Sequence, residues 1–373
     1  MDNWVSVWGQ AHTDISLMSP VYKNNTTRLV FRCGLSGTQL RVRFSNREGK
    51  KPYKIMQAFI SRKGQDQNQL VFQAKEQMTV APGEEICSDS LSYKVMAGEL
   101  LQLDIAFEGK VRSGNNIPAI VHGSQNGNFC RSAQFSAMHR SKTACFHGME
   151  APVPAVSSIE LRTENGAGTI VCFGDSITQQ GNWTRPLERI INLNRSNQWA
   201  IVNKGIGGNR LLRGPFGIIR MYGRSGVERF ERDALQEAGA KLIIFAIGTN
   251  DLAMARHPNK SDWVTAEQLQ NAMLSLADMA KRKEIRFFAA TIPPRMGSAG
   301  YLPEQEHERN KFNDWLRASR NFDGVLDFDA VLRDASRPTQ LNMAFDSGDH
   351  LHPGPLGGEE LANCVWKAIE GVI

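Results

Sequence analysis

The sequence predicts an α/β half built on a doubly wound parallel five-stranded sheet, preceded by an all-β sandwich or jelly-roll domain. Two observations give this prediction. After Gly166, short apolar runs alternate with amphipathic helical segments, which is the pattern of parallel strands buried on both faces. Before that point, strand-like runs are separated by Gly, Pro, Asn or Asp, and helical periodicity is weak. We therefore expect one domain over residues 1–162 and a second over residues 163–373, and the chain is long enough for two cores.

The amino-terminal half alternates apolar and polar residues in several of its runs. Leu40-Arg-Val-Arg-Phe44 and Leu101-Gln-Leu-Asp-Ile-Ala-Phe107 place every second side chain on one face, which is typical of antiparallel strands that are wet on the other face. A stiff linker is expected at Met149–Ala155. The predicted strands cover residues 28–35, 39–44, 70–73, 78–80, 91–95, 101–107 and 156–162.

The carboxyl-terminal half contains five successive pairs of a strand and a helix. The pairs cover residues 169–173 and 183–193, 200–203 and 227–238, 242–247 and 266–282, 285–291 and 304–320, and 325–328 and 356–369. Such repeats build an open sheet with helices on both faces. Because open α/β sheets bind ligands beyond the carboxyl ends of their strands, functional residues are expected there.

Composition and charge exclude several classes of protein. The net charge of +6 is spread along the chain among interleaved acidic residues, so no basic stripe predicts a nucleic-acid partner. No apolar run is long enough to span a membrane, and the amino terminus lacks the features of a secretory signal. Six cysteines stand at irregular intervals without a CxxC pair, which favours thiols over disulfides or a zinc site. We therefore expect a cytoplasmic protein without a membrane partner.

The run Val171-Cys-Phe-Gly-Asp-Ser-Ile-Thr178 presents a serine directly after a predicted strand. Gly174 permits backbone angles that other residues resist, so the chain can turn there and expose Ser176 at the edge of the sheet. The alternative is that the Asp-Ser pair only caps a helix, as short polar runs often do. Ser176 is thus a candidate nucleophile whose interpretation depends on what the other strand ends supply.

A polar loop before the last predicted helix, Phe345-Asp-Ser-Gly-Asp-His-Leu-His-Pro-Gly354, supplies candidates for a base. Asp349 and His352 stand three residues apart, so the carboxylate can reach Nδ1 of the imidazole while Nε2 faces a nucleophile. The alternative is a solvated turn with a surface histidine. His352 is preferred over His350 because Asp349 precedes it by three residues and because the Pro-Gly pair that follows would fix its backbone.

Two further strand ends carry donors for an oxyanion. Gly205-Ile-Gly-Gly-Asn209 follows the second predicted strand, and the backbone N–H of Gly208 could approach a substrate oxygen closely. Gly248-Thr-Asn-Asp251 follows the third strand, where the side-chain amide of Asn250 is another donor. Taken alone, these segments are also ordinary glycine turns and an Asn-Asp helix cap.

Together these four segments resemble the signature blocks of the SGNH, or GDSL-type, hydrolase superfamily, and they come in that family's order. The resemblance implies a flavodoxin-like sheet, with Ser176 as nucleophile, His352 as base and Asp349 as its orienting acid. It further implies an oxyanion hole made by the N–H of Ser176, the N–H of Gly208 and the side chain of Asn250. Neither a metal nor an organic cofactor is implied.

A narrower resemblance is to a bacterial subgroup often labelled xylan-esterase-like, which has an amino-terminal β domain. Thr249 departs from this subgroup, which more often has isoleucine at that position. The subgroup implies an acetylated oligosaccharide, or another small ester, as substrate. The residues that carry the resemblance are 203–212 and 226–233 in the second half and 40–46 and 80–89 in the first.

Three residues near the predicted site are candidate substrate contacts. Trp183 could line a sugar-binding cleft, although a tryptophan that starts a core helix is the alternative. Arg210 directly follows the glycine block. Tyr222 lies in the long stretch between that block and its helix, and such stretches often shape a pocket.

The sequence thus predicts a serine esterase that removes small acyl groups, acetyl above all, from carbohydrates by way of an acyl-enzyme. Two alternatives within the superfamily stay open, a lipase or lysophospholipase and a thioesterase. A third alternative, of another class, is a carbohydrate-binding protein whose hydrolase site is vestigial.

Overall fold

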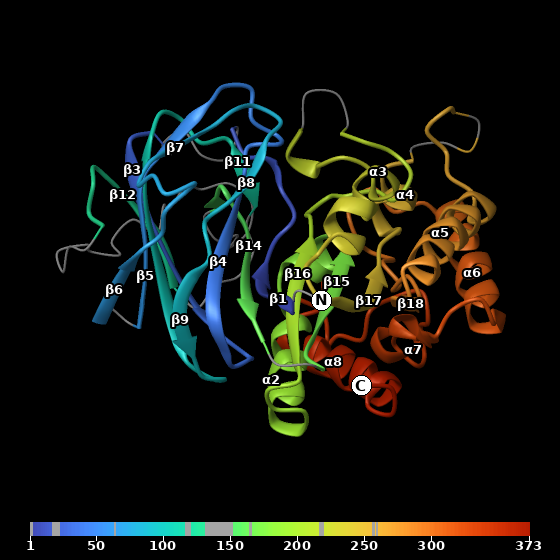
Figure 1. Cartoon of the computed structure of the whole chain (residues 1–373). Coiled ribbons are helices and arrows are strands. Elements are labelled where there is room, and N and C mark those ends of the chain that lie inside the picture. Colours follow the sequence, from blue (N-terminus) through green and yellow to red (C-terminus); the bar gives the residue numbers. More distant parts are fainter. Residues whose placement is uncertain are drawn as a thin grey trace. The chain divides into compact units, whose positions relative to one another are not determined.

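The computed structural model of the chain is shown in Figure 1. It describes residues 3–16, 23–62, 65–115, 121–130, 152–163, 166–215, 220–255, 258 and 260–373. The chain divides into two compact units, residues 1–169 with 196–202 and residues 170–195 with 203–373. The predicted boundary between residues 162 and 163 remains a prediction.

The first unit is built of antiparallel strands. These are β1 (Trp4–Gly9), β2 (Thr13–Asp14), β3 (Asn25–Arg32), β4 (Gly37–Ser45), β5 (Tyr53–Arg62), β6 (Gln65–Gln69), β7 (Met78–Val80), β8 (Glu85–Cys87), β9 (Leu91–Val95), β10 (Leu100–Glu108), β11 (Ser113–Asn115), β12 (Val121–Asn126), β13 (Val153–Pro154) and β14 (Val156–Arg162). One sheet has the order β1-β14-β4-β8, with β9 also paired to β4. A second has the order β12-β3-β10-β5-β6, with β7 also paired to β5, and a small third sheet has the order β13-β11-β2.

A single buried core joins the two large sheets. On β4, Leu40, Val42 and Phe44 are fully buried in this core, as alternation along a strand requires. Arg41 and Arg43 point to the other face of β4, where both bind Glu160 of β14, at 2.6 and 2.9 Å. The predicted all-β fold of this half is confirmed, because the two sheets contribute their apolar faces to one cluster.

Three details of the first half differ from the prediction. Residues 70–73 do not form a strand, because Gln73 and Ala74 adopt left-handed backbone angles in a tight turn. Strands β1, β2, β5, β6, β8, β11, β12 and β13 were not predicted. Residues 149–151 of the expected linker lie outside the described residues, and its remainder is partly structured, since β13 pairs with β11.

The rest of the chain alternates strands and helices as predicted. Its elements are β15 (Gly168–Gly174), α1 (Ser176–Gln179), α2 (Thr184–Asn194), β16 (Trp199–Gly205), η1 (Arg220–Tyr222), α3 (Gly226–Phe230), the π-helical turn η2 (Glu231–Leu235), β17 (Ala240–Ala246), α4 (Thr249–Ala253), α5 (Ala266–Arg282), β18 (Arg286–Ala290), α6 (Pro303–Ala318), β19 (Gly324–Leu326), α7 (Phe328–Leu332) and α8 (Pro355–Ile369). In the described part of the chain, the five strands have the order β16-β15-β17-β18-β19. This order confirms the doubly wound, flavodoxin-like sheet, whose direction of winding reverses beside β15.

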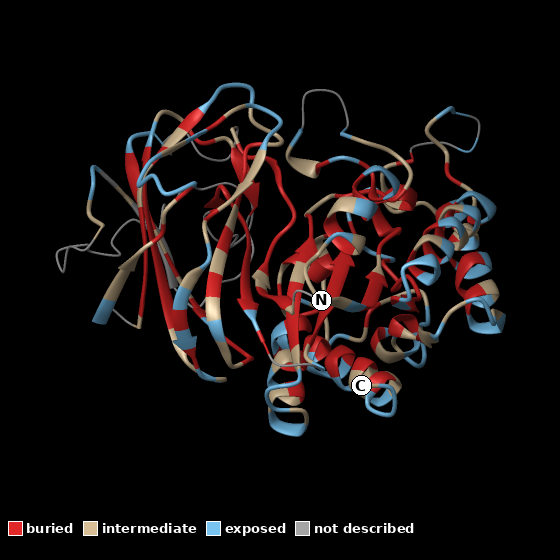
Figure 2. Cartoon of the chain, in the orientation of Figure 1, coloured by how far each residue is buried: buried red, intermediate tan, exposed pale blue. Residues whose placement is uncertain are grey.

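Aromatic residues and two helical layers enclose this sheet. The rings of Phe173 on β15 and Phe245 on β17 stack with centroids 5.3 Å apart, and Phe230 packs edge-on against both. Helix α8 packs against α2 and α7, whereas α5 packs against α3 and α6. Figure 2 shows the strands buried between helices whose outer faces are exposed.

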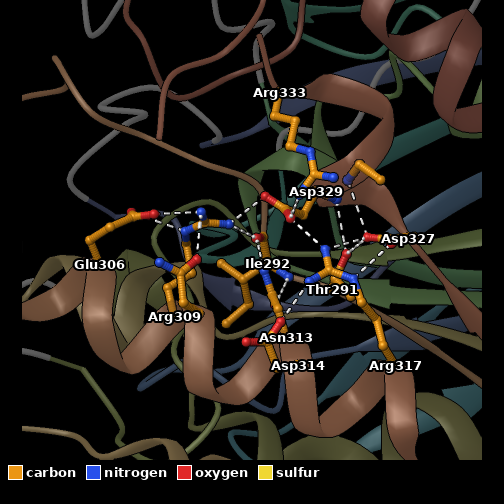
Figure 3. Close-up of polar contacts among 12 residues, drawn as sticks. Thr291, Ile292, Glu306, Arg309, Asn313, Asp314, Arg317, Asp327, Asp329 and Arg333 are labelled. Atoms are coloured by element: carbon orange, nitrogen blue, oxygen red, sulfur yellow. Dashed lines mark hydrogen bonds and ion pairs between the residues drawn. The ribbon is translucent and has the colours of Figure 1, made fainter. Parts of the chain in front are cut away.

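A partly buried network of ion pairs holds the last two strand ends to the helices that follow them (Figure 3). Arg309 of α6 binds Asp329 at 2.6 Å and the carbonyl of Ile292 at 2.8 Å. Arg317, two turns further along α6, binds Asp327 at 2.8 Å. Because Ile292 follows β18 and Asp327 follows β19, the network fixes the carboxyl edge of the sheet on the side away from β15.

We expect Phe245→Ala to destabilise the parallel-sheet unit by about 3–5 kcal/mol, because it removes a fully buried ring that contacts three other phenylalanines. The measurement is the midpoint of thermal unfolding. Leu193→Ala is the control, since Leu193 is 84% exposed and its truncation should leave the midpoint unchanged. Equal midpoints for the two variants would contradict the packing described above.

Candidate active site

Ser176, His352 and Asp349 form one hydrogen-bonded chain, although the serine and the histidine are far apart in the sequence. Oγ of Ser176 lies 2.8 Å from Nε2 of His352. Nδ1 of His352 lies 2.6 Å from Oδ2 of Asp349. A carboxylate on Nδ1 leaves Nε2 as the acceptor for the serine proton, so the arrangement can activate the hydroxyl as a nucleophile.

A crowded strand end fixes the position of Ser176. A side chain at Gly174 would lie 2.6 Å from the carbonyl oxygen of Ala246, so only glycine lets β15 approach β17 this closely. Asp175 then caps α1, because Oδ1 accepts the N–H of Ile177 at 3.0 Å. Ser176 is the first residue of the helix, and its N–H therefore has no acceptor within the helix. The hydroxyl and the N–H are both displayed at the edge of the sheet.

The loop before α8 holds the histidine through backbone contacts. Oδ1 of Asp349 accepts the N–H groups of Leu351 and His352 at 3.0 and 2.8 Å. The N–H of Ser347 bonds the carbonyl of His352 at 3.0 Å, which closes the loop. Burial raises the pKa of Asp349, but the hydrogen bonds from the side chain and backbone of His352 outweigh it and lower this pKa to about 2. The carboxylate is thus charged wherever the histidine is to act as a base.

A second pair of aspartate and histidine lies in the same loop and contacts different residues. Nδ1 of His350 lies 2.7 Å from Oδ2 of Asp346, and the His350 ring packs on Gly297. Oδ1 of Asp346 accepts the N–H of His350 at 3.0 Å. The histidine that contacts Ser176 is therefore His352, the one that the sequence favours.

The two predicted oxyanion donors lie next to each other. Gly208 has a φ of +72°, which favours glycine, and its backbone is half exposed. Nδ2 of Asn250 donates to the carbonyl of Asn209 at 3.0 Å, which orients an amide that is itself buried. The amide carries a second hydrogen, which the predicted role in an oxyanion hole requires.

Arg229 of α3 forms hydrogen bonds with the segments that carry Ser176 and Gly208. Its guanidinium donates to the carbonyls of Gly174 and Lys204, at 2.8 and 2.9 Å, and to Oδ1 of Asn209 at 2.9 Å. Asp233 pairs with it at 3.2 Å. Arg229 thereby joins the ends of β15 and β16 to the segment that carries Gly208, a role that the sequence does not reveal.

Asn182 connects the segment after Ser176 to the loop that carries His352. Its Nδ2 donates to the carbonyl of Pro353, the residue after His352, at 2.9 Å. A side chain at Gly358 on α8 would lie 2.1 Å from the carbonyl oxygen of Asn182, so glycine is needed for this close approach. No motif in the sequence marks Asn182, because its partner lies 171 residues away.

Two buried carboxyl groups, Asp175 and Asp251, are the sequence neighbours of Ser176 and Asn250. Burial raises the pKa of Asp175 to about 6, partly opposed by the N–H of Ile177 and by His352. It likewise raises the pKa of Asp251 to about 6, against hydrogen bonds from the N–H groups of Leu212 and Leu211. Through these two hydrogen bonds, Asp251 holds the residues after Arg210 at the start of α4.

The three predicted substrate contacts have different surroundings. Trp183 is fully buried and packs edge-on against Phe328, so we remove it from the predicted contacts and assign it to the core. Arg210 is also buried, and its guanidinium bonds the carbonyl of Gly214 at 2.5 Å within its own loop. Tyr222 is half exposed, and its ring lies directly on Gly208.

Among the described residues, no helix is both long and apolar enough to cross a membrane. Nor do His, Cys, Asp and Glu side chains in the described ranges gather in groups of three or more that could hold a metal ion.

A family model, the GDSL-like lipase/acylhydrolase family, matches residues 172–359, half of the chain. The chain belongs to the GDSL-like lipase/acylhydrolase family. The match of this acylhydrolase-family chain begins in β15 and ends in α8, so it spans all four strand-end segments. A search of the curated proteins finds no match.

Solved structures are similar to part of this chain. A GDSL-like lipase from Bacteroides thetaiotaomicron is 18% identical, with a TM-score of 0.40, over 55% of this chain and 89% of that one. A catalytic mutant of Axe2, an acetylxylan esterase from Geobacillus stearothermophilus, is 17% identical, with a TM-score of 0.43, over 55% of this chain and 95% of that one.

We expect Asp349→Asn to lower kcat for an activated ester by about 10⁴-fold, because an amide nitrogen facing Nδ1 would stabilise the wrong tautomer of His352. The measurement is the rate across pH 5–9, a range in which the lowered pKa keeps the wild-type carboxylate charged. Asp346→Asn is the matched control in the same loop, and its rate should stay within a few-fold of wild type. A larger loss in the control than in Asp349→Asn would contradict the assignment of the pair.

We expect Asn182→Ala to lower kcat about tenfold with little change in KM, because it frees the carbonyl of Pro353 and loosens His352 without touching the substrate. Steady-state kinetics on p-nitrophenyl acetate measure the effect. Asn194→Ala is the control, because Asn194 makes the same kind of bond, 2.8 Å long, to a carbonyl within α2. Unchanged kcat in Asn182→Ala would refute the positioning role.

Proposed function

We propose that this chain is a serine esterase that hydrolyses small acyl esters, acetyl in particular, on carbohydrates. The observation that carries the proposal is the 2.8 Å contact between Oγ of Ser176 and Nε2 of His352, with Asp349 on the other ring nitrogen. Membership of the acylhydrolase family supports ester hydrolysis as the reaction class.

Acylation begins at the serine hydroxyl. His352 takes the proton of Ser176 as the oxygen attacks the ester carbonyl, and Asp349 stabilises the imidazolium that forms. The negative charge on the carbonyl oxygen is taken up by the N–H groups of Ser176 and Gly208 and by the amide of Asn250. The imidazolium then protonates the leaving alcohol oxygen, which departs as the free hydroxyl of the sugar.

Deacylation repeats these steps with water in place of the alcohol. His352 removes a proton from water, the resulting hydroxide attacks the acyl-enzyme, and the same donors hold the oxyanion. The imidazolium returns the proton to Oγ of Ser176. Acetic acid leaves and loses its proton to the solvent as acetate forms, and both residues regain their starting protonation states.

The choice of an acetylated carbohydrate rests on the sequence resemblance to the xylan-esterase-like subgroup. The contacts of His352 support an active hydrolase over a vestigial one, because Ser176, His352 and Asp349 lie within hydrogen-bonding distance in the order that the reaction needs.

We expect the wild-type protein to hydrolyse p-nitrophenyl acetate and to release acetate from acetylated xylo-oligosaccharides, and Ser176→Ala to reduce both rates at least about 10³-fold. Release of p-nitrophenolate and of acetate measures the two reactions. Ser336→Ala, at an exposed serine away from these contacts, is the control and should keep wild-type rates.

Two outcomes would overturn parts of this proposal. Turnover of p-nitrophenyl acetate that survives in Ser176→Ala would refute the nucleophile. Faster hydrolysis of long-chain glycerol esters or of acyl thioesters than of acetylated oligosaccharides would instead assign the chain to a lipase or a thioesterase.

A further inference from the structure

The ring of Tyr222 lies against the glycine that supplies an oxyanion donor. A side-chain carbon placed on Gly208 would be 2.3 Å from Cδ1 and 2.5 Å from Cε1 of Tyr222, so the edge of the ring is in direct contact with the Cα of Gly208. An oxyanion held by the adjacent N–H would lie about 3 Å from that nitrogen. Tyr222 is therefore among the side chains nearest to a substrate carbonyl bound at this donor.

Hydrogen bonds fix the backbone of Tyr222 in this place. Nδ2 of Asn209 donates to the carbonyls of Tyr222 and Arg224, both at 2.7 Å. Oδ1 of the same side chain accepts from buried Arg229 at 2.9 Å. The residue after Gly208 thus clamps the segment whose ring covers Gly208, and a ring held in this way can act as a rigid wall.

The segments that carry Tyr222 and His352 lead into different helical layers. Tyr222 precedes α3, which packs with α5 in one helical layer, whereas His352 precedes α8, which packs with α2 and α7 in the other. The leaving oxygen must lie within hydrogen-bonding distance of Nε2 of His352. The oxyanion occupies the donors at Gly208 and Asn250, so the acyl substituent takes the remaining position on the tetrahedral carbon. Because the ring of Tyr222 lies on Gly208, an acyl chain that extends from this carbon passes close to the ring.

We propose that Tyr222 limits the length of the acyl group, so that an acetyl methyl fits between Ser176 and the ring and longer chains collide with it. This inference rests on the proposed serine esterase function and adds that Tyr222 selects the acyl group of the substrate. The ring's bulk carries the selectivity, and the hydroxyl does not.

The test compares kcat/KM for p-nitrophenyl butyrate and p-nitrophenyl acetate, which share one leaving group and differ only in the acyl chain. The butyrate-to-acetate ratio should rise at least about tenfold in Tyr222→Ala and in Tyr222→Leu, which keeps more of the side chain in place. Tyr222→Phe should keep the wild-type ratio. Trp366→Ala, at a half-buried aromatic near the end of α8, is the control for general loosening and should also keep it.

An unchanged ratio in either folded Tyr222→Ala or folded Tyr222→Leu, with hydrolysis still dependent on Ser176, would overturn the inference and leave the proposed function standing. A raised ratio in Trp366→Ala would overturn it too, because selectivity would then follow general stability. Failure of the function itself is distinguished by Ser176→Ala, whose undiminished turnover would remove both.

Discussion

The buried guanidinium of Arg229 is the interaction on which the rest of the site depends. It is 1% exposed, lies 3.8 Å from the centre of the Phe173 ring and donates to groups on three separate segments. Burial lowers its pKa to about 10, partly opposed by Asp233, so the group is still charged near neutral pH. A charge buried at this depth is tolerated only when its N–H groups are bonded, and here they bond to the ends of β15 and β16.

This constraint explains how residues from distant parts of the sequence reach one place. Arg229 fixes the carbonyl of Gly174, two residues before Ser176, and Oδ1 of Asn209, one residue after Gly208. The carbonyl of Asn209 in turn orients Asn250. The geometry of the predicted oxyanion hole therefore depends on the side chain of Arg229.

Sequence reasoning predicts the members of the candidate site better than it predicts what supports them. Ser176, Gly208 and Asn250 follow strands of one parallel sheet, so the periodicity that predicts the strands also predicts that these residues meet. The bonds from Asn182 and Arg229 that join distant segments stay hidden, because they end on the backbone carbonyls of Pro353, Gly174 and Lys204, which leave no mark in the sequence. Trp183 was predicted as a substrate contact although it is buried in the core. The sequence beside a motif does not show whether a tryptophan faces solvent or the core.

The two halves of the fold also differ in how well the sequence predicts their elements. Helices such as α5 and α6 follow from local periodicity and begin within one residue of the predicted positions. Antiparallel strands depend more on their partners: β5 lies between β10 and two short strands, and its buried residues do not alternate regularly. Residues 70–73 form an apolar run that looks like a strand but is not one. The run places Phe72 in the core, and a turn follows directly.

Backbone conformation, and not side-chain chemistry, distinguishes the two histidines of the loop before α8. Both have an aspartate on Nδ1, at 2.7 Å for His350 and 2.6 Å for His352. His350 has a φ of +60°, a left-handed conformation that turns the chain between the two histidines. His350 is left on Gly297 with its ring largely exposed, while His352 reaches Ser176. An Asp-His pair is therefore a common local structure, and what makes one pair a candidate for catalysis is the serine that the sheet brings to its free nitrogen.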